Sequence, residues 1–193
     1  MSLTKYMNKR NFSVTPEPES TKRPKSTGKL VFVVQRHKAS SLHYDFRLEM
    51  NGALKSWAVP KGPSLFPEDK RLAMMVEDHP LSYAGFKGII PEGNYGAGIV
   101  EIWDKGTYEP IEKKDHKSDE RKLVSDLRNG SLKFILHGKK LKGEFALVKM
   151  KTSQDNAWLL IKHKDKHAVD KSYNSEQFTP INSPINKALK VKS

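Results

Sequence analysis

The chain contains no cysteine among its 193 residues. Disulfide bridges, thiolate metal sites and cysteine nucleophiles are therefore excluded, and a bound metal must be held by His, Asp, Glu or backbone oxygen. Such ligands suit hard or borderline ions such as Mn²⁺, Mg²⁺, Fe²⁺ or Zn²⁺. Histidines and carboxylates are thus the residues in which to look for a metal centre.

Several other sequence features are also lacking. No apolar run approaches the roughly 20 residues that a membrane span needs, and the first residues, MSLTKYMNKRNFSV, lack the apolar region of a signal peptide. There is no internal repeat and no Walker A loop, and the glycines of GNYGAG lack the strand-then-helix context of a nucleotide fingerprint. We therefore expect a soluble, cytoplasmic protein without a membrane partner.

Positive charge is in excess, with a formal net charge of +13. Residues 1–29 carry seven Lys or Arg against two Glu, and residues 164–193 carry six against three acidic residues. This concentration of charge in the tails favours a polyanion such as nucleic acid as partner, through counterion release from phosphates. A solubilising role for Lys-rich tails is the alternative.

The composition divides the chain into three parts. Residues 1–28 include TPEPESTKRPKSTG, which is too polar to fold alone, so we expect a flexible or draped basic arm. Residues 29–163 are long enough for one domain with a hydrophobic core, and we expect that domain to be monomeric. Residues 164–193 lose all periodicity and are predicted to form a polar, basic tail.

Short strand-like runs separated by turn residues dominate the central part. Their number and spacing predict a mainly β fold, a small closed antiparallel barrel of about eight strands. One segment differs: Leu123, Val124 and Leu127 have helical spacing before a glycine, which predicts a short charged helix near 119–128. The predicted strands are 30–36, 42–49, 53–59, 71–77, 99–104, 131–136, 143–149 and 157–163.

The stretch HKASSLHYDFRLE, residues 37–49, is the main candidate for a site. Because side chains alternate along a strand, the apolar residues of this run would face a core, and His43, Asp45 and Arg47 would share the other face. His37 could fold back across the short turn towards His43 and Asp45. Two imidazoles and a carboxylate suit a divalent ion with open positions, although such pairs also occur for hydrogen bonding alone.

Further polar residues could complete a phosphate site. The planar guanidinium of Arg47 suits a phosphoryl group, although it could instead pair with Asp45 or Glu49. In the stretch EDHPLSY, His79 and Tyr83 could join Arg47 in a clamp for a developing oxyanion, with His79 as a proton donor. Lys61 and Arg71 stand in loops that could close over the same face, or they could be ordinary surface residues.

Three segments in the same order carry a resemblance to a known family. They read FVVQRHKASSLHYDFRLEMNGALKSWAVPKGPS, KRLAMMVEDHPLSYAGFKG and IPEGNYGAGIVEIWDKGTYEP. The chain resembles the 3′-phosphoesterase module of bacterial DNA ligase D and its free-standing relatives, densely over about residues 30–110 and more loosely to about 163. The resemblance implies a small β-barrel and a Mn²⁺-dependent enzyme that trims 3′ ends in end-joining repair.

In that family a phosphodiesterase activity removes a terminal ribonucleoside, and a phosphomonoesterase activity then removes the remaining 3′-phosphate. The resemblance implies metal ligands at His37, His43 and Asp45, and catalytic groups at Arg47, His79 and Tyr83. It places four further residues close to the site, with phosphate or DNA contacts as their implied role: Gln35, Lys61, Arg71 and Glu77.

The amino-terminal arm, KRNFSVTPEPE, also resembles that of the family. The family's arm usually reads R-D-F, where this chain has Arg10, Asn11 and Phe12, whereas Glu17 is kept. We expect this change from an acid to an amide to affect the diesterase step more than the monoesterase step. The implied partners are primer–template DNA 3′ ends and, since no ligase or polymerase segment is recognisable, a separate ligase and polymerase acting in trans.

Two functions of other classes remain open at the level of sequence. A catalytically silent DNA-binding barrel would keep the basic tails but show no metal-dependent turnover. An Fe²⁺ oxygenase could use two histidines and one carboxylate as its facial triad, with a different second histidine such as His79. Arg47, Lys61 and Arg71 near the metal favour a phosphate substrate over that chemistry.

Overall fold

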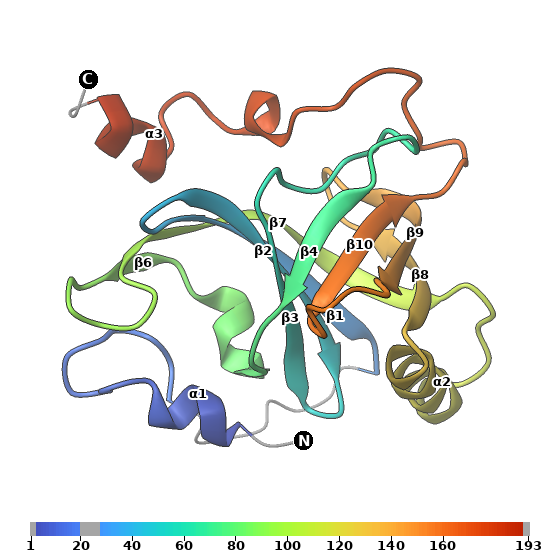
Figure 1. Ribbon diagram of the computed structural model, residues 1–193, viewed down its shortest axis with the longest axis horizontal. Helices are drawn as coiled ribbons and strands as arrows, with labels where there is room; N and C mark the ends of the chain where they lie inside the picture. The colour runs from blue at the N-terminus through green and yellow to red at the C-terminus, as the bar shows by residue number, and fades with distance from the viewer. Residues whose placement is uncertain (1–2, 20–27, 191–193) are drawn as a thin grey trace.

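Antiparallel strands close into a barrel in the computed structural model, which describes residues 3–19 and 28–190. Within this part of the chain, eight strands follow one another in the order β1-β2-β3-β4-β10-β9-β8-β7, and β7 pairs with β1 to close the ring (Figure 1). The predicted fold is confirmed. The bounds are β1 Leu30–Lys38, β2 Leu42–Met50, β3 Ala53–Val59, β4 Arg71–Met75, β7 Gly98–Pro110, β8 Ser131–His137, β9 Lys142–Lys149 and β10 Ala157–Lys162.

Each predicted strand corresponds to a strand of the barrel. Alternation along β2 sends Tyr44, Phe46 and Leu48 into the interior, where they pack with buried aromatic residues such as Trp57 and Phe134. Two short strands were not predicted, β5 (His79–Pro80), which pairs with β3, and β6 (Gly88–Ile90), which pairs with β7. Both are too short to show a period.

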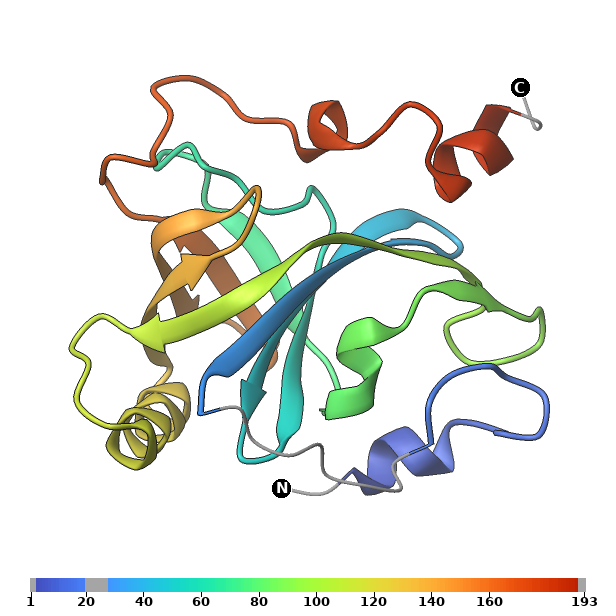
Figure 2. The same ribbon diagram turned by 180° about the vertical axis from the view of Figure 1, so that it is seen from behind.

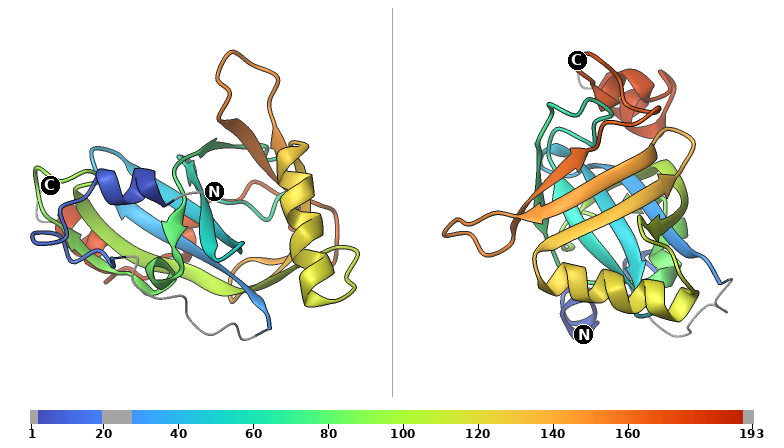
Figure 3. Two further views of the ribbon diagram at one scale, coloured as in Figure 1. Left: turned by 90° about the horizontal axis from the view of Figure 1, so that it is seen from below. Right: turned by 90° about the vertical axis from the view of Figure 1, so that its right-hand side faces the viewer.

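Helix α2, His116–Arg128, covers one end of the barrel (Figure 3). It begins three residues before the predicted start, because the Asp115 carboxylate accepts hydrogen bonds from the backbone N–H groups of the first turn. Leu123, Val124 and Leu127 are buried in the barrel core. The helix therefore closes this end with the apolar face that its spacing predicted.

The C-terminal segment lies across the opposite end of the barrel (Figure 2). It contains a short 3₁₀ helix, η2 (Ser175–Phe178), and helix α3 (Pro184–Lys190). Glu176 and Asn186 bind the buried guanidinium of Arg36, which also pairs with Glu101 on β7. The segment predicted as a polar tail is thus ordered against the barrel, through this buried charge and through buried apolar residues such as Ile185.

The N-terminal arm is likewise draped over the barrel in its described part. Helix α1, Thr4–Asn8, lies beside the 3₁₀ helix η1, Leu81–Gly85 (Figure 1). Tyr6 is fully buried and packs with Tyr83 and His79 in a second apolar cluster, outside the barrel wall. Residues 20–27 of the predicted arm and residues 191–193 of the predicted tail lie outside the described part of the chain.

None of the helices in the described part of the chain is both long and apolar enough to cross a membrane.

Candidate functional site

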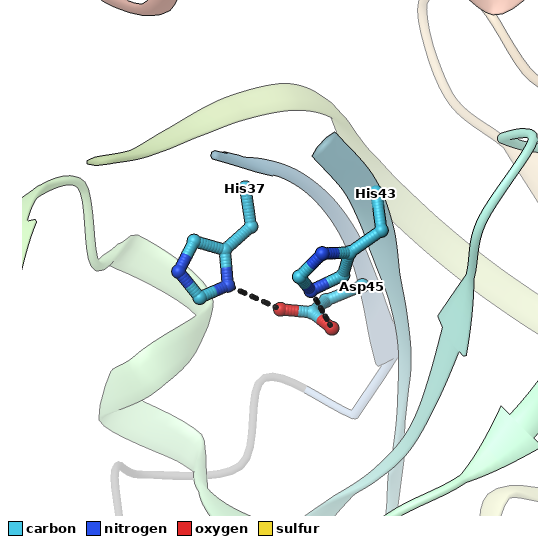
Figure 4. A group of neighbouring side chains, drawn as sticks. All are labelled: His37, His43 and Asp45. Carbon is cyan, nitrogen blue, oxygen red and sulfur yellow. Dashed lines mark ion pairs between the residues drawn. The ribbon is translucent and has the colours of Figure 1, made fainter. Parts of the chain in front are cut away.

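Two neighbouring strands bring His37, His43 and Asp45 together on the outer face of the barrel. His37 on β1 stands directly opposite His43 on β2, and Asp45 follows two residues later (Figure 4). Asp45 Oδ2 lies 3.6 Å from His37 Nδ1, and Asp45 Oδ1 lies 3.6 Å from His43 Nε2. One ligand atom from each residue lies within 4.8 Å of the others, which is close enough for all three to hold one ion.

The outer nitrogens of both imidazoles are held by backbone carbonyls. His37 donates its Nε2–H to the Gly96 carbonyl (2.9 Å), and His43 donates its Nδ1–H to the Ser41 carbonyl (3.1 Å). Because a carbonyl only accepts hydrogen bonds, these contacts leave the lone pairs of His37 Nδ1 and His43 Nε2 directed towards Asp45. This arrangement is better explained by the binding of a divalent ion than by a purely structural role of the two histidines.

The glycine-rich loop after β6 provides one of those carbonyls. Gly96 has a φ of +77°, a left-handed conformation that glycine adopts without strain. At Gly98 a Cβ atom would lie 2.1 Å from the carbonyl oxygen of Lys38, so only glycine allows β7 to approach β1 there. The motif GNYGAG therefore borders the His–His–Asp cluster.

Asp45 is ionised at this position. Burial raises its pKa, but the Arg47 guanidinium acts against burial, and the pKa lies well below its ordinary value. Arg47 Nη2 donates to Asp45 Oδ2 over 3.0 Å. Two neutral imidazoles and one carboxylate are a donor set that suits Mn²⁺, Fe²⁺ and Zn²⁺.

Arg47 lies on the same strand face, as the alternation predicted, and is fixed by three partners. Besides Asp45, its Nε donates to Gln35 Oε1 (2.7 Å) and its Nη1 donates to Ser56 Oγ (2.8 Å). Gln35 is itself held, because its amide donates to the carbonyl oxygen of Tyr83. The pairing with Asp45 that the sequence left as an alternative is therefore present, and the same contacts orient the guanidinium towards the cavity that it lines.

His79 faces the same cavity from β5. Its Nδ1–H donates to the Glu77 carbonyl (2.9 Å), so its Nε2 accepts from Arg10 Nη2 (3.3 Å). Burial lowers the pKa of His79 well below its ordinary value, and the charges of Arg47 and Arg10 lower it further. In this state His79 is neutral and presents an acceptor, so the predicted role of proton donor requires a bound anion to raise its pKa.

The arm completes the cavity through Arg10 and Glu17. Glu17 Oε1 accepts hydrogen bonds from Arg10 Nε and from the Tyr83 hydroxyl, both over 2.9 Å. Arg10 also lies 3.4 Å from Glu77 Oε1. Because Tyr83 donates its hydroxyl proton to Glu17, its place in the site depends on the arm.

The predicted residues divide into two groups. Those that line one cavity of about 260 Å³ are Arg10, Glu17, His37, His43, Asp45, Arg47, Glu77, His79 and Tyr83, while Gln35 lies directly behind Arg47. Lys61, Arg71 and Asn11 do not line it. Arg71 binds Asp69 and the carbonyl oxygen of Tyr173, Lys61 is exposed after β3, and the exposed Asn11 accepts hydrogen bonds from Ser13.

Sequence reasoning missed Ser56, Gly96 and Tyr95. Ser56 is a small residue in a strand, and its contact with Arg47 arises only from the pairing of β2 with β3. Tyr95 lines the cavity from the glycine-rich loop. Its position as an aromatic residue between glycines was the only signal in the sequence that could have identified Tyr95. The oxygenase alternative expected His79 among the ligands, whereas the cluster found in the described residues consists of His37, His43 and Asp45.

Comparison with known proteins points to one family. Residues 35–149 match the DNA Ligase D 3′-phosphoesterase domain family. The chain is 51% identical over 168 residues to the multifunctional non-homologous end joining protein LigD of Pseudomonas aeruginosa, covering 86% of this chain and 19% of that protein. It is 43% identical over 180 residues to LigD of Mycobacterium bovis, covering 93% of this chain and 22% of that protein.

The LigD of Mycolicibacterium smegmatis is 39% identical over 191 residues, covering 99% of this chain and 24% of that protein. The chain thus spans about a fifth to a quarter of the length of these relatives. The matched residues include the His–His–Asp cluster and also Arg47, His79 and Tyr83. The chain therefore belongs to the DNA ligase D 3′-phosphoesterase domain family.

Proposed function

We propose that this protein is a metal-dependent phosphoesterase that heals DNA 3′ ends for end joining. It would remove a terminal 3′-ribonucleoside as a phosphodiesterase and a terminal 3′-phosphate as a phosphomonoesterase. The observation that carries the proposal is the meeting of a His–His–Asp cluster with a fixed guanidinium in one cavity. The relatives' printed names, which describe non-homologous end joining proteins, support a DNA end as the substrate.

His37, His43 and Asp45 would hold the ion, which we propose is Mn²⁺. When bound, such an ion supplies Lewis acidity to phosphate oxygens and lowers the pKa of water. The ionised state of Asp45 and the tautomers set by the backbone carbonyls fit this role. Other divalent transition ions share this donor preference, so the identity of the ion is a matter for measurement.

Arg47 would bind the phosphoryl oxygens. Its orientation is set before substrate arrives by Gln35, Ser56 and Asp45, and phosphoryl transfer depends mainly on positioning and charge stabilisation. A bound phosphate would offset the charges of Arg47 and Arg10 that lower the pKa of His79. His79 could then share a proton with the phosphate or the leaving 3′-oxygen, while hydrolysis places the oxygen of water on phosphorus and frees the 3′-hydroxyl.

The direct test is phosphate release from a primer–template with a 3′-phosphate and added Mn²⁺. His43→Ala and His79→Ala should each lower the rate by on the order of 100-fold. His137→Ala is the matched control, because His137 is half-exposed and pairs with Glu109, outside the cavity. Wild-type rates for both site variants would overturn the assignment.

Metal binding can be measured without turnover. Calorimetric titration of metal-free protein with Mn²⁺ should show one site in the wild type and in His137→Ala, and none in His43→Ala. A silent DNA-binding barrel would bind DNA without releasing phosphate. An oxygenase would bind Fe²⁺ and consume an organic co-substrate, and neither of these results agrees with the proposal.

The diesterase step is tested with a single 3′-ribonucleotide at the end. We propose that Asn11 in the arm limits this step, because the family usually has an acid there. Asn11→Asp should raise ribonucleoside removal relative to phosphate release. Its exposed side chain serves only as an acceptor for Ser13, so a carboxylate can replace it without strain.

A further inference from the structure

A second hollow adjoins the catalytic cavity. It has a volume of about 530 Å³, and it shares Val76, Glu77 and Tyr95 with the cavity that contains the His–His–Asp cluster. The two hollows therefore meet at these three residues. A chain that places its end in the catalytic cavity can leave through this second hollow, which we call the lysine groove.

Lysines and an aromatic residue line the lysine groove. Lys5 and Lys9 come from the arm, and Lys149 is the last residue of β9. The ammonium of Lys149 pairs with Asp155, whose side chain is 96% exposed, so this ion pair contributes little and can be exchanged for a phosphate. Lysines beside an aromatic ring are the combination that binds nucleic-acid strands through phosphates and base stacking.

Tyr95 stands at the junction of the two hollows with about half of its side chain exposed (49%). The Lys9 ammonium lies 4.2 Å from its ring centroid. The carbonyl of the next residue, Gly96, accepts the hydrogen bond from His37. The Tyr95 ring is therefore one residue away from a direct contact with the His–His–Asp cluster. A nucleoside that is attached to a phosphate in the catalytic cavity and extends into the lysine groove would lie next to this ring.

We propose that the lysine groove holds the DNA segment adjoining the 3′ end, with Tyr95 stacked on the terminal base and Lys149 facing a backbone phosphate. This inference rests on the proposed function, since it takes the 3′ end as the occupant of the catalytic cavity. It assigns to Tyr95 the recognition of a base without reading its identity, because every base has a face that can stack.

The role of Tyr95 can be tested by measuring the affinity for a fluorescently 5′-labelled primer–template with a 3′-phosphate by fluorescence anisotropy. EDTA is present so that no turnover occurs. Tyr95→Ala should weaken binding by about 10-fold, as expected for the loss of one stacked base. Tyr95→Phe keeps the ring and should stay within about twofold of the wild type. On the same end made abasic at its last nucleotide, Tyr95→Ala should cause no further loss. An equal loss on both ends, or none on either, would overturn the assignment.

The contact of Lys149 has its own readout. Lys149→Ala should reduce the slope of log K against log salt by about one, since one phosphate contact is lost. Lys142→Ala is the matched control, because Lys142 is exposed at the opposite end of the same strand and does not line the groove. Equal slopes for the two variants would contradict the proposal.

The two proposals can fail separately. If the wild type binds the end with these dependences but releases no phosphate, the proposed function fails and the groove stands. If phosphate is released while Tyr95 and the terminal base are not coupled, the groove assignment fails and the function stands.

Discussion

Glu176 anchors the C-terminal segment to the barrel, and replacing it with Gln tests how much that segment contributes to stability. Its carboxylate accepts hydrogen bonds from Arg36 Nε (2.9 Å) and Nη2 (2.6 Å), and from the Tyr44 hydroxyl. The Arg36 side chain is 1% exposed and also pairs with Glu101 over 2.9 Å. Glu176→Gln preserves the size of the side chain but removes the charge and turns an amide donor towards these donors.

The structure sets the size of the effect. Removing one partner of a fully buried ion pair costs about 3–5 kcal/mol. Here Glu101 still neutralises Arg36, and Glu176 is 39% exposed, so solvent screens part of the interaction. We therefore expect the free energy of unfolding to fall by about 2 kcal/mol, which corresponds to a decrease in Tm of about 4–8 °C for a chain of this size.

Urea unfolding at pH 7 measures this change, with Glu68→Gln as the control because Glu68 is exposed in a nearby loop. Burial raises the pKa of Glu176, but hydrogen bonds from Arg36 and Tyr44 outweigh it and lower the pKa below its ordinary 4.5. The stabilisation is thus complete above pH 4.5 and is lost as pH falls through the lowered pKa. Equal stability of the two variants at pH 7 would refute the reasoning.

Three further predictions concern the site. Glu17→Gln replaces the buried acceptor of the Tyr83 hydroxyl, so we expect the free energy of unfolding to fall by about 2 kcal/mol and the arm to be cleaved faster by proteases. An unchanged cleavage rate would contradict this role of Glu17. Burial lowers the pKa of His79, so the unfolded chain gains a proton below pH 6.5 that the native chain lacks. Because of His79, the free energy of unfolding should fall by up to about 1.4 kcal/mol for each pH unit below 6.5, and it should fall less steeply in His79→Gln. The same pH dependence in the wild type and the variant would contradict this prediction. Ser56→Ala removes the acceptor of Arg47 Nη1 and should raise the KM for a 3′-phosphate end about 10-fold. Ser56→Thr keeps a hydroxyl and should restore the KM. An unchanged KM in Ser56→Ala would show that Arg47 is oriented without Ser56.

Local patterns in the sequence were sufficient for the barrel wall and for one face of the site. Alternation along residues 42–49 separated the interior Tyr44 and Phe46 from Asp45 and Arg47, because strand geometry fixes the side-chain period. The same rule identified the strands of the ring. The spacing of Leu123, Val124 and Leu127 identified α2 for the same kind of reason.

The contacts that complete the site were not accessible in this way. Ser56 reaches Arg47 only through the register of β2 with β3, and Arg10 reaches His79 across 69 positions of chain. Lys61 and Arg71 seemed equally suitable from charge alone, yet neither lines the cavity, and Arg71 is the first residue of β4 instead of a loop residue. A charge in a loop carries no information about the direction in which the loop folds.

The sequence by itself thus determined the eight strands of the ring, helix α2 and the shared face of His43, Asp45 and Arg47, because these follow from short-range periods. The tertiary structure alone decided the register between the strands, the packing of the arm and the position of the C-terminal segment across one barrel end (Figure 2). Those two segments are polar and without a period, and they are ordered by buried contacts such as Glu17 with Tyr83 and Glu176 with Arg36, whose partners lie on other parts of the fold. Such contacts form only where the folded barrel supplies the partner residue.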